Sequence, residues 1–186
     1  VAVMAIVVIL QPELRKAVEE LGRKNIISSI MPFEIGKKPG EGRFSDKTIN
    51  EIVKACVEMG KVKTGALIVV QQDQPLDEYE RTGIEVDGIV TSQLLINIFE
   101  KNTPLHDGAV IVRGDRVTSA TCYLPLSDNM ALSKDLGTRH RAGVGISEAT
   151  DSMTVIVSEE TGKISVAYGG NLDRNLSGDA LKEKLK

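Results

Sequence analysis

Short aliphatic runs recur along the chain, and their length limits what each can form. A buried strand needs about four to eight residues, whereas a helix of similar burial needs at least ten. The runs therefore predict strands, bounded by Gly, Pro, Asp or Asn turn residues. They cover residues 1–10, 65–71, 109–112, 117–123, 153–157 and 163–168. The turn from Arg113 to Arg116 joins two of them into a β-hairpin, and the turn Glu160-Thr161-Gly162 joins two more.

Helical patterns lie between these runs. Pro12 to Gly22 repeats apolar residues every three or four positions, and Ser45 can cap a helix that ends at Gly60. Shorter helices are expected after Thr91 or Ser92 and over Arg139 to Glu148. Strands and helices do not alternate strictly. This favours an α/β chain of the α+β kind, a mixed central β-sheet flanked by helices, over a doubly wound fold.

We expect one domain over residues 1–186. The Pro- and Gly-rich residues 32–44 form an exposed loop inside it, because neither flank could fold alone. Residues 72–89 are polar and rich in turn residues. The end of the chain from Asn171 is polar, so residues 171–186 are predicted to be a peripheral tail.

The composition is that of a globular protein and argues against general nucleic-acid binding. The chain is 41% hydrophobic and 26% charged, with a net charge of -3, which is typical of a globular protein. A weakly acidic chain is a poor candidate for nucleic-acid binding, although a few Arg residues can still bind a small phosphorylated ligand. Cys56 and Cys122 lack metal-ligand spacing and are expected to be buried, reduced thiols.

The opening run from Val1 to Leu10 is too short to span a bilayer and lacks the features of a signal peptide. We interpret it as a buried strand.

Three stretches carry candidate chemistry. In the first, His106, Asp107, Gly108 and Ala109 precede a strand. Gly108 and Ala109 leave the backbone open to a ligand. The Asp107 carboxylate suits Mg²⁺ or Mn²⁺, and His106 could add a ligand that Mn²⁺ or Co²⁺ accepts more readily than Mg²⁺. The alternative is a solvated Asp in a turn beside a structural His.

The second stretch is Gly137-Thr138-Arg139-His140-Arg141, at a predicted helix start. Backbone N–H groups there favour an anion, and guanidinium groups bind phosphate in a fork. Basic residues are unfavourable at a helix N-terminus unless an anion is present. A charged helix end facing water is the alternative.

The third stretch is Ser158-Glu159-Glu160, where a strand ends in a tight turn. Glu160 could complete a metal site with Asp107, or the pair of acids could be a solvated turn. Phosphate-loop and dinucleotide fingerprints are absent from the sequence. These residues alone indicate metal-assisted phosphate chemistry or nucleotide binding.

The order of these stretches resembles a known family. Asp107-Gly108-Ala109, followed by Arg139-His140-Arg141, is similar to the paired DGA and RHR motifs of diadenylate cyclases, closest to the membrane-associated CdaA-type branch. The likeness covers roughly residues 5–175. Supporting stretches are residues 11–15, 65–69, 103–109, 123–127 and 157–162. Gly143 departs from the pattern, since relatives more often carry Ala there.

The resemblance implies a fold of the same type and a role for each matching residue. Asp107 would serve the metal and the reacting ribose hydroxyl, with His106 and Glu160 as further metal ligands. Gly108 and Ala109 would allow the ribose to approach, and Tyr123 and Leu124 would hold the adenine. Thr138, Arg139 and Ser158 would hold the triphosphate, and Gly137 and Glu159 would also belong to the nucleotide site. His140 and Arg141 would shape that loop and, with Asp107 and Arg139, would be catalytic.

The implied reaction condenses two ATP into cyclic di-AMP and two pyrophosphates, with Mn²⁺, Mg²⁺ or Co²⁺. Because the product is two-fold symmetric and the chain carries one set of motifs, we expect a face-to-face homodimer. Relatives imply a membrane regulatory protein and a phosphoglucosamine mutase as partners. They also imply a cytoplasmic domain whose full-length protein is anchored by N-terminal helices absent here. Rival interpretations are another ATP-using nucleotidyltransferase, a nucleotide sensor without catalysis, and a structural module.

Overall fold

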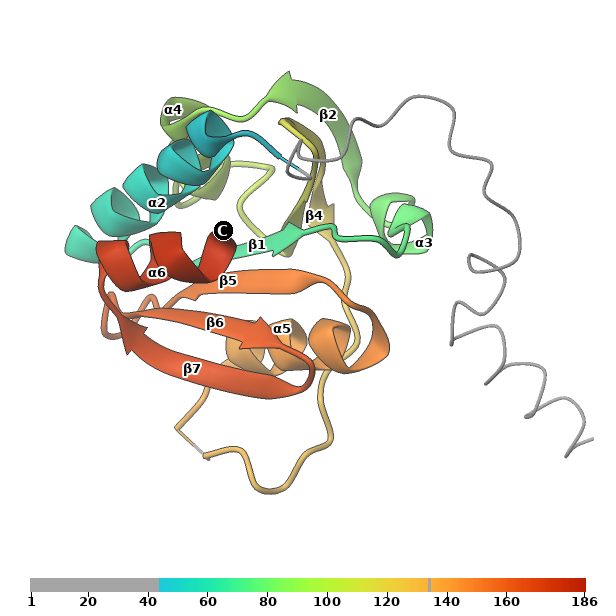
Figure 1. The fold of residues 1–186 in the computed structure, drawn as a ribbon, viewed down its shortest axis with the longest axis vertical. Coiled ribbons are helices and arrows are strands. Elements are labelled where there is room, and N and C mark those ends of the chain that lie inside the picture. Colours follow the sequence, from blue (N-terminus) through green and yellow to red (C-terminus); the bar gives the residue numbers. More distant parts are fainter. Residues whose placement is uncertain (1–43, 134) are drawn as a thin grey trace, which may run out of the picture. The chain divides into compact units, whose positions relative to one another are not determined.

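A mixed seven-stranded sheet is the centre of the computed structural model, which describes residues 44–133 and 135–186 (Figure 1). The strand order is β2-β4-β3-β1-β5-β6-β7. Strands β1 and β3 pair in parallel, and the other neighbouring pairs are antiparallel. The strands are β1 (Ala66–Val70), β2 (Ile84–Ile89), β3 (Ala109–Arg113), β4 (Arg116–Cys122), β5 (Met153–Val157), β6 (Ile164–Tyr168) and β7 (Asn171–Leu176). The predicted mixed sheet is confirmed.

Helices cover both faces of the sheet. The helices α2 (Asp46–Lys61), α4 (Ser92–Phe99) and α6 (Gly178–Leu185) pack on one face, and α5 (Thr138–Ala149) packs on the other. Figure 1 shows α2 and α6 in front of the sheet and α5 behind it. The short α3 (Asp77–Glu80) precedes β2. The predictions for residues 1–43, including the strand from Val1 and the helix from Pro12, lie outside the described residues.

Strand β1, in the centre of the sheet, shows why an apolar run in this sequence is continuous and does not alternate with polar residues. All of its residues are buried, because both faces of the strand are covered. Ile68 and Val70 point into the core beneath α2, α4 and α6, whereas Leu67 and Val69 point into the core beneath α5. Each such fully buried side chain contributes about 1.5–3 kcal/mol relative to exposure. The sheet therefore provides a well-packed scaffold for the loops at its ends.

The predicted start of α2 is confirmed, and its cap has a partner far away in sequence. Ser45 Oγ accepts a hydrogen bond from the Thr48 backbone N–H at 3.3 Å. Asp115, in the β3–β4 turn, accepts from Ser45 N at 2.8 Å and from Thr48 Oγ1 at 2.6 Å. The backbone N–H groups at this helix start have no partner inside the helix. The neutral Ser45 hydroxyl and the charged Asp115 carboxylate accept hydrogen bonds from them instead.

Two segments differ from the sequence-based predictions. Residues 72–89, predicted as polar turns, contain α3 and strand β2. Because β2 lies at the sheet edge with mostly exposed side chains, it has no apolar run to reveal it. Residues 171–186, predicted to be peripheral, instead form edge strand β7 and helix α6. Leu181 and Leu185 of α6 are buried in the main core, so this tail is part of the domain.

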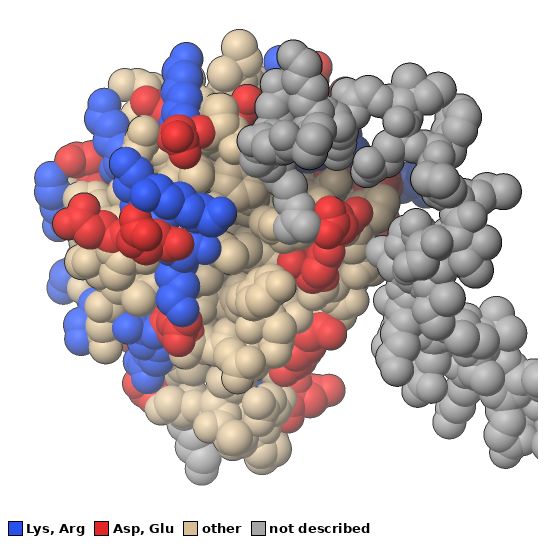
Figure 2. All heavy atoms as spheres, in the orientation of Figure 1, with Lys and Arg blue, Asp and Glu red and all other residues tan. Residues whose placement is uncertain are grey.

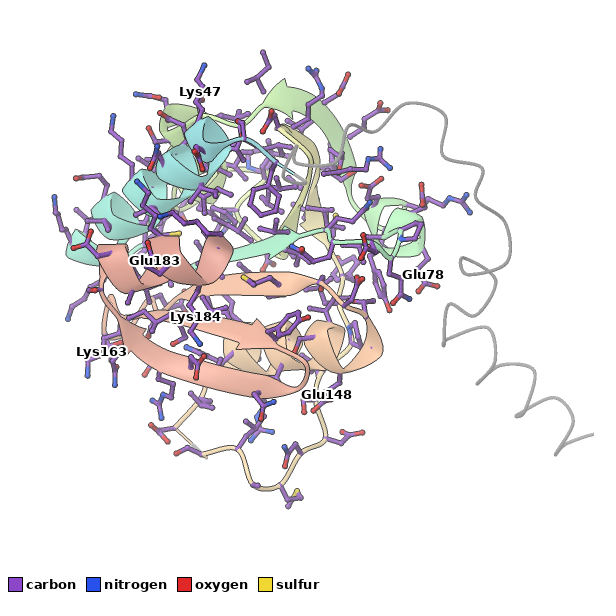
Figure 3. The ribbon with its side chains drawn as sticks, viewed as in Figure 1. Lys47, Glu78, Glu148, Lys163, Glu183 and Lys184 are labelled. Carbon is purple, nitrogen blue, oxygen red and sulfur yellow. The ribbon has the colours of Figure 1, made fainter. Side chains whose placement is uncertain are left out.

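The face carrying α2 and α6 mixes charges of both signs, with Lys and Arg interleaved by Asp and Glu (Figure 2). Several of these charges are paired: Lys61 with Glu58, Lys186 with Glu183, and Lys184 with Asp173. Figure 3 shows Lys184 reaching from α6 toward β7. Exposed pairs of this kind contribute little to stability, about 0–1 kcal/mol each. Within residues 44–133 and 135–186, no helix combines the length and the apolarity needed to cross a membrane.

Candidate nucleotide site

Four strand ends meet at one end of the sheet. The register pairs Ala66 at the start of β1 with Val157 at the end of β5, and Ala109 at the start of β3 with Cys122 at the end of β4. The two parallel strands therefore begin where their antiparallel neighbours end. Segments that are distant in sequence are brought together there, including all three stretches singled out above.

A hollow of about 380 Å³ opens at this end of the sheet. Its walls come from β1, the loop before β3, the segment after β4, the start of α5 and the turn after β5. The lining residues are Leu67, Asp107, Gly108, Cys122, Tyr123, Leu124, Leu126, Thr138, Arg139, Ala142 and Glu159. Seven of them are predicted site residues, and the structure brings those seven together. Cys122 is predicted only as a buried thiol. Leu67 and Leu126 lie inside stretches that support the family resemblance, and the motifs assign no role to them or to Ala142.

The Asp107–Gly108 wall combines a free carboxylate with bare backbone. Among the described residues, the Asp107 side chain forms no hydrogen bond or ion pair. Gly108 has φ of 95°, and a Cβ there would lie 2.8 Å from the carbonyl carbon of Thr121. Only glycine fits both constraints. Thr121 also has positive φ, at 55°, where the β3–β4 register shifts. Such strain is typical of functional sites.

His106 is oriented by its own loop. Its Nδ1 lies 2.6 Å from the Thr103 carbonyl oxygen. A carbonyl oxygen can only accept, so the proton is on Nδ1, and Nε2 is left free to take a ligand when the ring is neutral. Ala109, the last residue of this stretch, is fully buried at the start of β3 and does not line the hollow.

Tyr123 and Leu124 form the opposite, more apolar wall. Tyr123 is 76% exposed, an unusual position for an aromatic ring with no partner. Leu124 is half-buried and packs against the core beneath α5. Beyond them, the Ser127 N–H donates to the Arg141 carbonyl at 3.0 Å, and Ser127 Oγ donates to Glu148 at 2.7 Å. The segment is thereby fixed along α5, with Glu148 near its C-terminal end (Figure 3).

Arg139 supplies the positive charge of the hollow. Its Nη1 lies 2.6 Å from Glu159 Oε2, and its Nε is buried without a hydrogen-bond partner. It sits in the first turn of α5, whose N-cap Gly137 is extended and provides no side-chain cap. The first turn of α5 and a guanidinium therefore border the same hollow. Such an arrangement is chemically suited to phosphate or another anion.

His140 and Arg141 do not line this hollow. His140 lies in an adjacent small hollow of about 40 Å³ together with Ser158 and Glu160. Its ring is 8% exposed, and burial, followed by the nearby charge of Arg174, lowers the pKa of His140. Arg141 is half-buried and lines neither hollow. Both residues lie in α5 outside the larger hollow, and the shaping and catalytic roles implied for them stay predictions.

The structure separates the predicted metal ligands. Asp107 lines the larger hollow and Glu160 the smaller one. Within the described ranges, no three His, Cys, Asp or Glu side chains are grouped closely enough to hold an ion. A single free carboxylate still fits Mg²⁺ or Mn²⁺, because such ions are often held by one or two carboxylates together with substrate phosphates. The shared site remains a prediction.

The fold and the hollow define an α+β domain in which Arg139, at the start of α5, lies in the same hollow as an apolar wall. The family model described as "DisA bacterial checkpoint controller nucleotide-binding" (DAC) matches residues 53–172. The chain is 52% identical to cyclic di-AMP synthase CdaA of Bacillus subtilis, over 98% of this chain and 64% of that protein. It is 51% identical to a diadenylate cyclase of Listeria monocytogenes, with the same coverage. This chain belongs to the DAC family.

Two solved structures have a similar fold. The crystal structure of a double mutant of DacA from Staphylococcus aureus is 50% identical and has a TM-score of 0.74, covering 75% of this chain and 93% of that one. A hypothetical membrane spanning protein from Bacillus cereus is 31% identical with a TM-score of 0.68, covering 91% and 79%. The chain spans about two thirds of the length of the curated relatives above, 64% in each case.

Proposed function

We propose that this chain is the catalytic domain of a diadenylate cyclase, which joins two ATP molecules into cyclic di-AMP and releases two pyrophosphates. The observation that supports the proposal is that Asp107, Tyr123 and Arg139, the last in the first turn of α5, all line one hollow. The names of relatives that are about half identical support the same reaction.

Each part of ATP has a suitable place in the hollow. The adenine would lie against Tyr123 and Leu124, because an exposed ring offers stacking area at low conformational cost. The ribose would pass over Gly108, where the backbone is bare. The triphosphate would accept hydrogen bonds from the first turn of α5 and from the Arg139 guanidinium, whose Nε has no partner.

Catalysis would be mainly positioning and electrostatics. The 3′-hydroxyl of each ATP attacks the α-phosphorus of the other, so two phosphodiester bonds form, two bonds to pyrophosphate break, and the two hydroxyl protons are released to solvent. Asp107 lies on the ribose side and would orient that hydroxyl. Arg139 would stabilise negative charge that builds on the phosphate oxygens. A divalent cation, when held by Asp107 and phosphate oxygens, supplies charge screening and polarises the hydroxyl.

The product requires two such sites. It contains two adenylates related by two-fold symmetry, whereas the hollow carries one set of groups. Tyr123 at 76% and Leu126 at 56% exposure leave an apolar rim around the opening. A second copy meeting this rim face to face would bring the two nucleotides together. Turnover should therefore rise more steeply than linearly with protein concentration in the range where the dimer forms.

Anchoring of the whole protein in a membrane belongs to the same proposal. It is supported by the likeness to CdaA and to the membrane spanning protein of Bacillus cereus.

The deciding experiment incubates the purified chain with ATP and Mn²⁺, Mg²⁺ or Co²⁺ and separates the products by chromatography. Asp107→Asn should yield no cyclic di-AMP while keeping the fold, and Asp179→Asn in α6 serves as a matched control with full activity. Absence of product from the parent chain at high concentration with every metal would overturn the proposal. Release of a different adenylylated product would replace it with another transferase reaction.

A further inference from the structure

Gly65 lies immediately before β1, beside the anion-binding part of the hollow. A Cβ at this position would lie 2.8 Å from Arg139 Nη1, 3.0 Å from Arg139 Cζ and 3.0 Å from Glu159 Cβ. Real Cβ atoms essentially never approach other atoms within 3.0 Å. The guanidinium and the stem of its carboxylate partner therefore occupy the space that any other residue's side chain would fill.

Conformation does not explain this glycine. Gly65 is absent from the glycines with positive φ, which include Gly108, Gly114 and Gly162. Its backbone geometry is open to L-residues, so alanine could adopt it without strain. The requirement for glycine is steric and points at one neighbour, the Arg139–Glu159 pair.

The position of Arg139 depends on this space. Its side chain is 21% exposed, with Nη1 held by Glu159 and Nε buried without a partner. A buried polar group without a partner is unfavourable unless a ligand satisfies it. Because a Cβ at residue 65 would crowd Nη1 and Cζ, the guanidinium would have to shift, and its remaining donors would turn away from their present positions.

We propose that Gly65 is a positioning residue, which sets the place of the Arg139 guanidinium and thereby the affinity for the triphosphate. This inference rests on the proposed function for the identity of the ligand. It predicts a selective effect: a methyl group at residue 65 disturbs the phosphate side of the hollow and leaves the Tyr123 side unchanged.

The test measures Kd values for ATP and for adenosine, which lacks phosphates, in the parent chain and in Gly65→Ala. We expect the Kd for ATP to rise about tenfold or more, the size of losing hydrogen bonds to a charged group. The Kd for adenosine should stay within about twofold, since the adenine wall is untouched. In an Arg139→Lys background, which removes the clashing guanidinium, Gly65→Ala should have little further effect on ATP.

Gly178→Ala is the matched control. A Cβ there would meet side-chain atoms of Val57 at 3.2 Å and of Val53 at 3.6 Å, far from the hollow. It reports the effect of a Gly→Ala change on the chain in general, and it should leave both Kd values unchanged. An unchanged Kd for ATP in Gly65→Ala would overturn the inference. Equal weakening of ATP and adenosine, together with a lower Tm, would also overturn it and indicate a structural role.

A second measurement needs no nucleotide. The Nε–H resonance of Arg139 in an NMR spectrum, assigned by its loss in Arg139→Lys, should shift in Gly65→Ala and stay in place in Gly178→Ala. If the parent binds no ATP, the proposed function fails and this resonance decides the inference alone. If the parent makes cyclic di-AMP while the resonance and the Kd for ATP are unchanged in Gly65→Ala, the inference fails alone.

Discussion

The backbone N–H of Tyr123 donates a hydrogen bond of 2.9 Å to Thr82 Oγ1. Thr82 in turn donates to the Tyr79 carbonyl at 2.7 Å, so its hydroxyl is oriented by the end of α3. The turn between α3 and β2 thus fixes the start of the apolar wall, although 41 residues separate the two partners. Thr82 thus contacts Tyr123 of the hollow, whereas Gly65 lies against Arg139 and Glu159.

Replacing Thr82 by Val should weaken ATP binding through Tyr123. The substitution keeps the shape and removes both hydrogen bonds of the hydroxyl, at a cost of about 0.5–1.5 kcal/mol for each. We expect KM for ATP to rise severalfold with little change in kcat. Steady-state kinetics test this, with Thr82→Ser as the control that keeps the hydroxyl. Equal KM values in both variants would show that the bond does not position Tyr123.

Much of this fold is predictable from the sequence, because buried strands are continuous apolar runs and helix starts carry recognisable caps. β1, the β3–β4 hairpin, α2 and α4 all follow from such local signals. Edge strands β2 and β7 do not follow from the sequence, because their side chains are mostly exposed and form no continuous apolar run. An edge strand is defined by its pairing with a neighbouring strand, and that pairing depends on the tertiary fold.

The site, like the fold, is only partly predictable from the sequence. Motifs identified Asp107, Arg139 and Tyr123, and the structure gathers them around one hollow. Sequence could not reveal that Glu159 holds Arg139, that Thr82 holds Tyr123, or that Glu160 lies in a separate hollow from Asp107. Those relationships depend on strand register and on the position of α5 over the sheet.

Two glycines of α5 should respond differently to alanine. A Cβ on Gly145 would lie 2.1 Å from the Pro125 carbonyl oxygen, which is backbone and cannot rotate away. A Cβ on Gly143 would meet side-chain atoms of Ile156, at 2.9 Å, and of Thr154. Side chains can adjust, and alanine gains about 1 kcal/mol of helix propensity over glycine.

We therefore expect Gly145→Ala to lower the free energy of unfolding by about 1–3 kcal/mol or more, as overpacking does. Gly143→Ala should change it by less than about 1 kcal/mol, because propensity offsets the crowding. Urea denaturation of both variants provides the comparison. Equal losses would mean that the Pro125 segment moves freely away from α5.

The titration of His140 should report its charged neighbours. Burial, and then Arg174, hold the pKa of His140 below its ordinary value of 6.5, whereas Asp135 and Glu160 act in the opposite direction. A lowered pKa disfavours the protonated ring in the folded state. Its contribution to stability is therefore complete above the unfolded pKa and is lost as pH falls through the folded value.

NMR titration of the His140 ring checks this assignment. Arg174→Gln should raise the pKa of His140, because it removes a nearby positive charge. Glu160→Gln should lower it further, because it removes a negative one. The two shifts must have opposite signs. Shifts in the same direction would show that the variants act by rearranging the α5 start rather than through charge.

Both thiols should be inert in the folded protein. Burial raises the pKa of Cys56 to about 12, and burial together with Glu80 raises the pKa of Cys122 to about 12. At pH 8 only about one thiol in ten thousand would then be ionised, compared with roughly one in ten at the ordinary value of 9. Reaction with a thiol reagent requires the thiolate.

We expect negligible labelling of the native chain by 5,5′-dithiobis(2-nitrobenzoic acid) at pH 8, and rapid labelling of both cysteines in denaturant. Even at pH 10 only about one thiol in a hundred would be ionised, because the folded pKa values are about 12, so labelling of the native chain should stay far slower than in denaturant. Cys56→Ala and Cys122→Ala assign any signal to its residue. Stoichiometric labelling of native Cys122 within minutes at pH 8 would contradict this prediction and show that the wall around it opens to solvent.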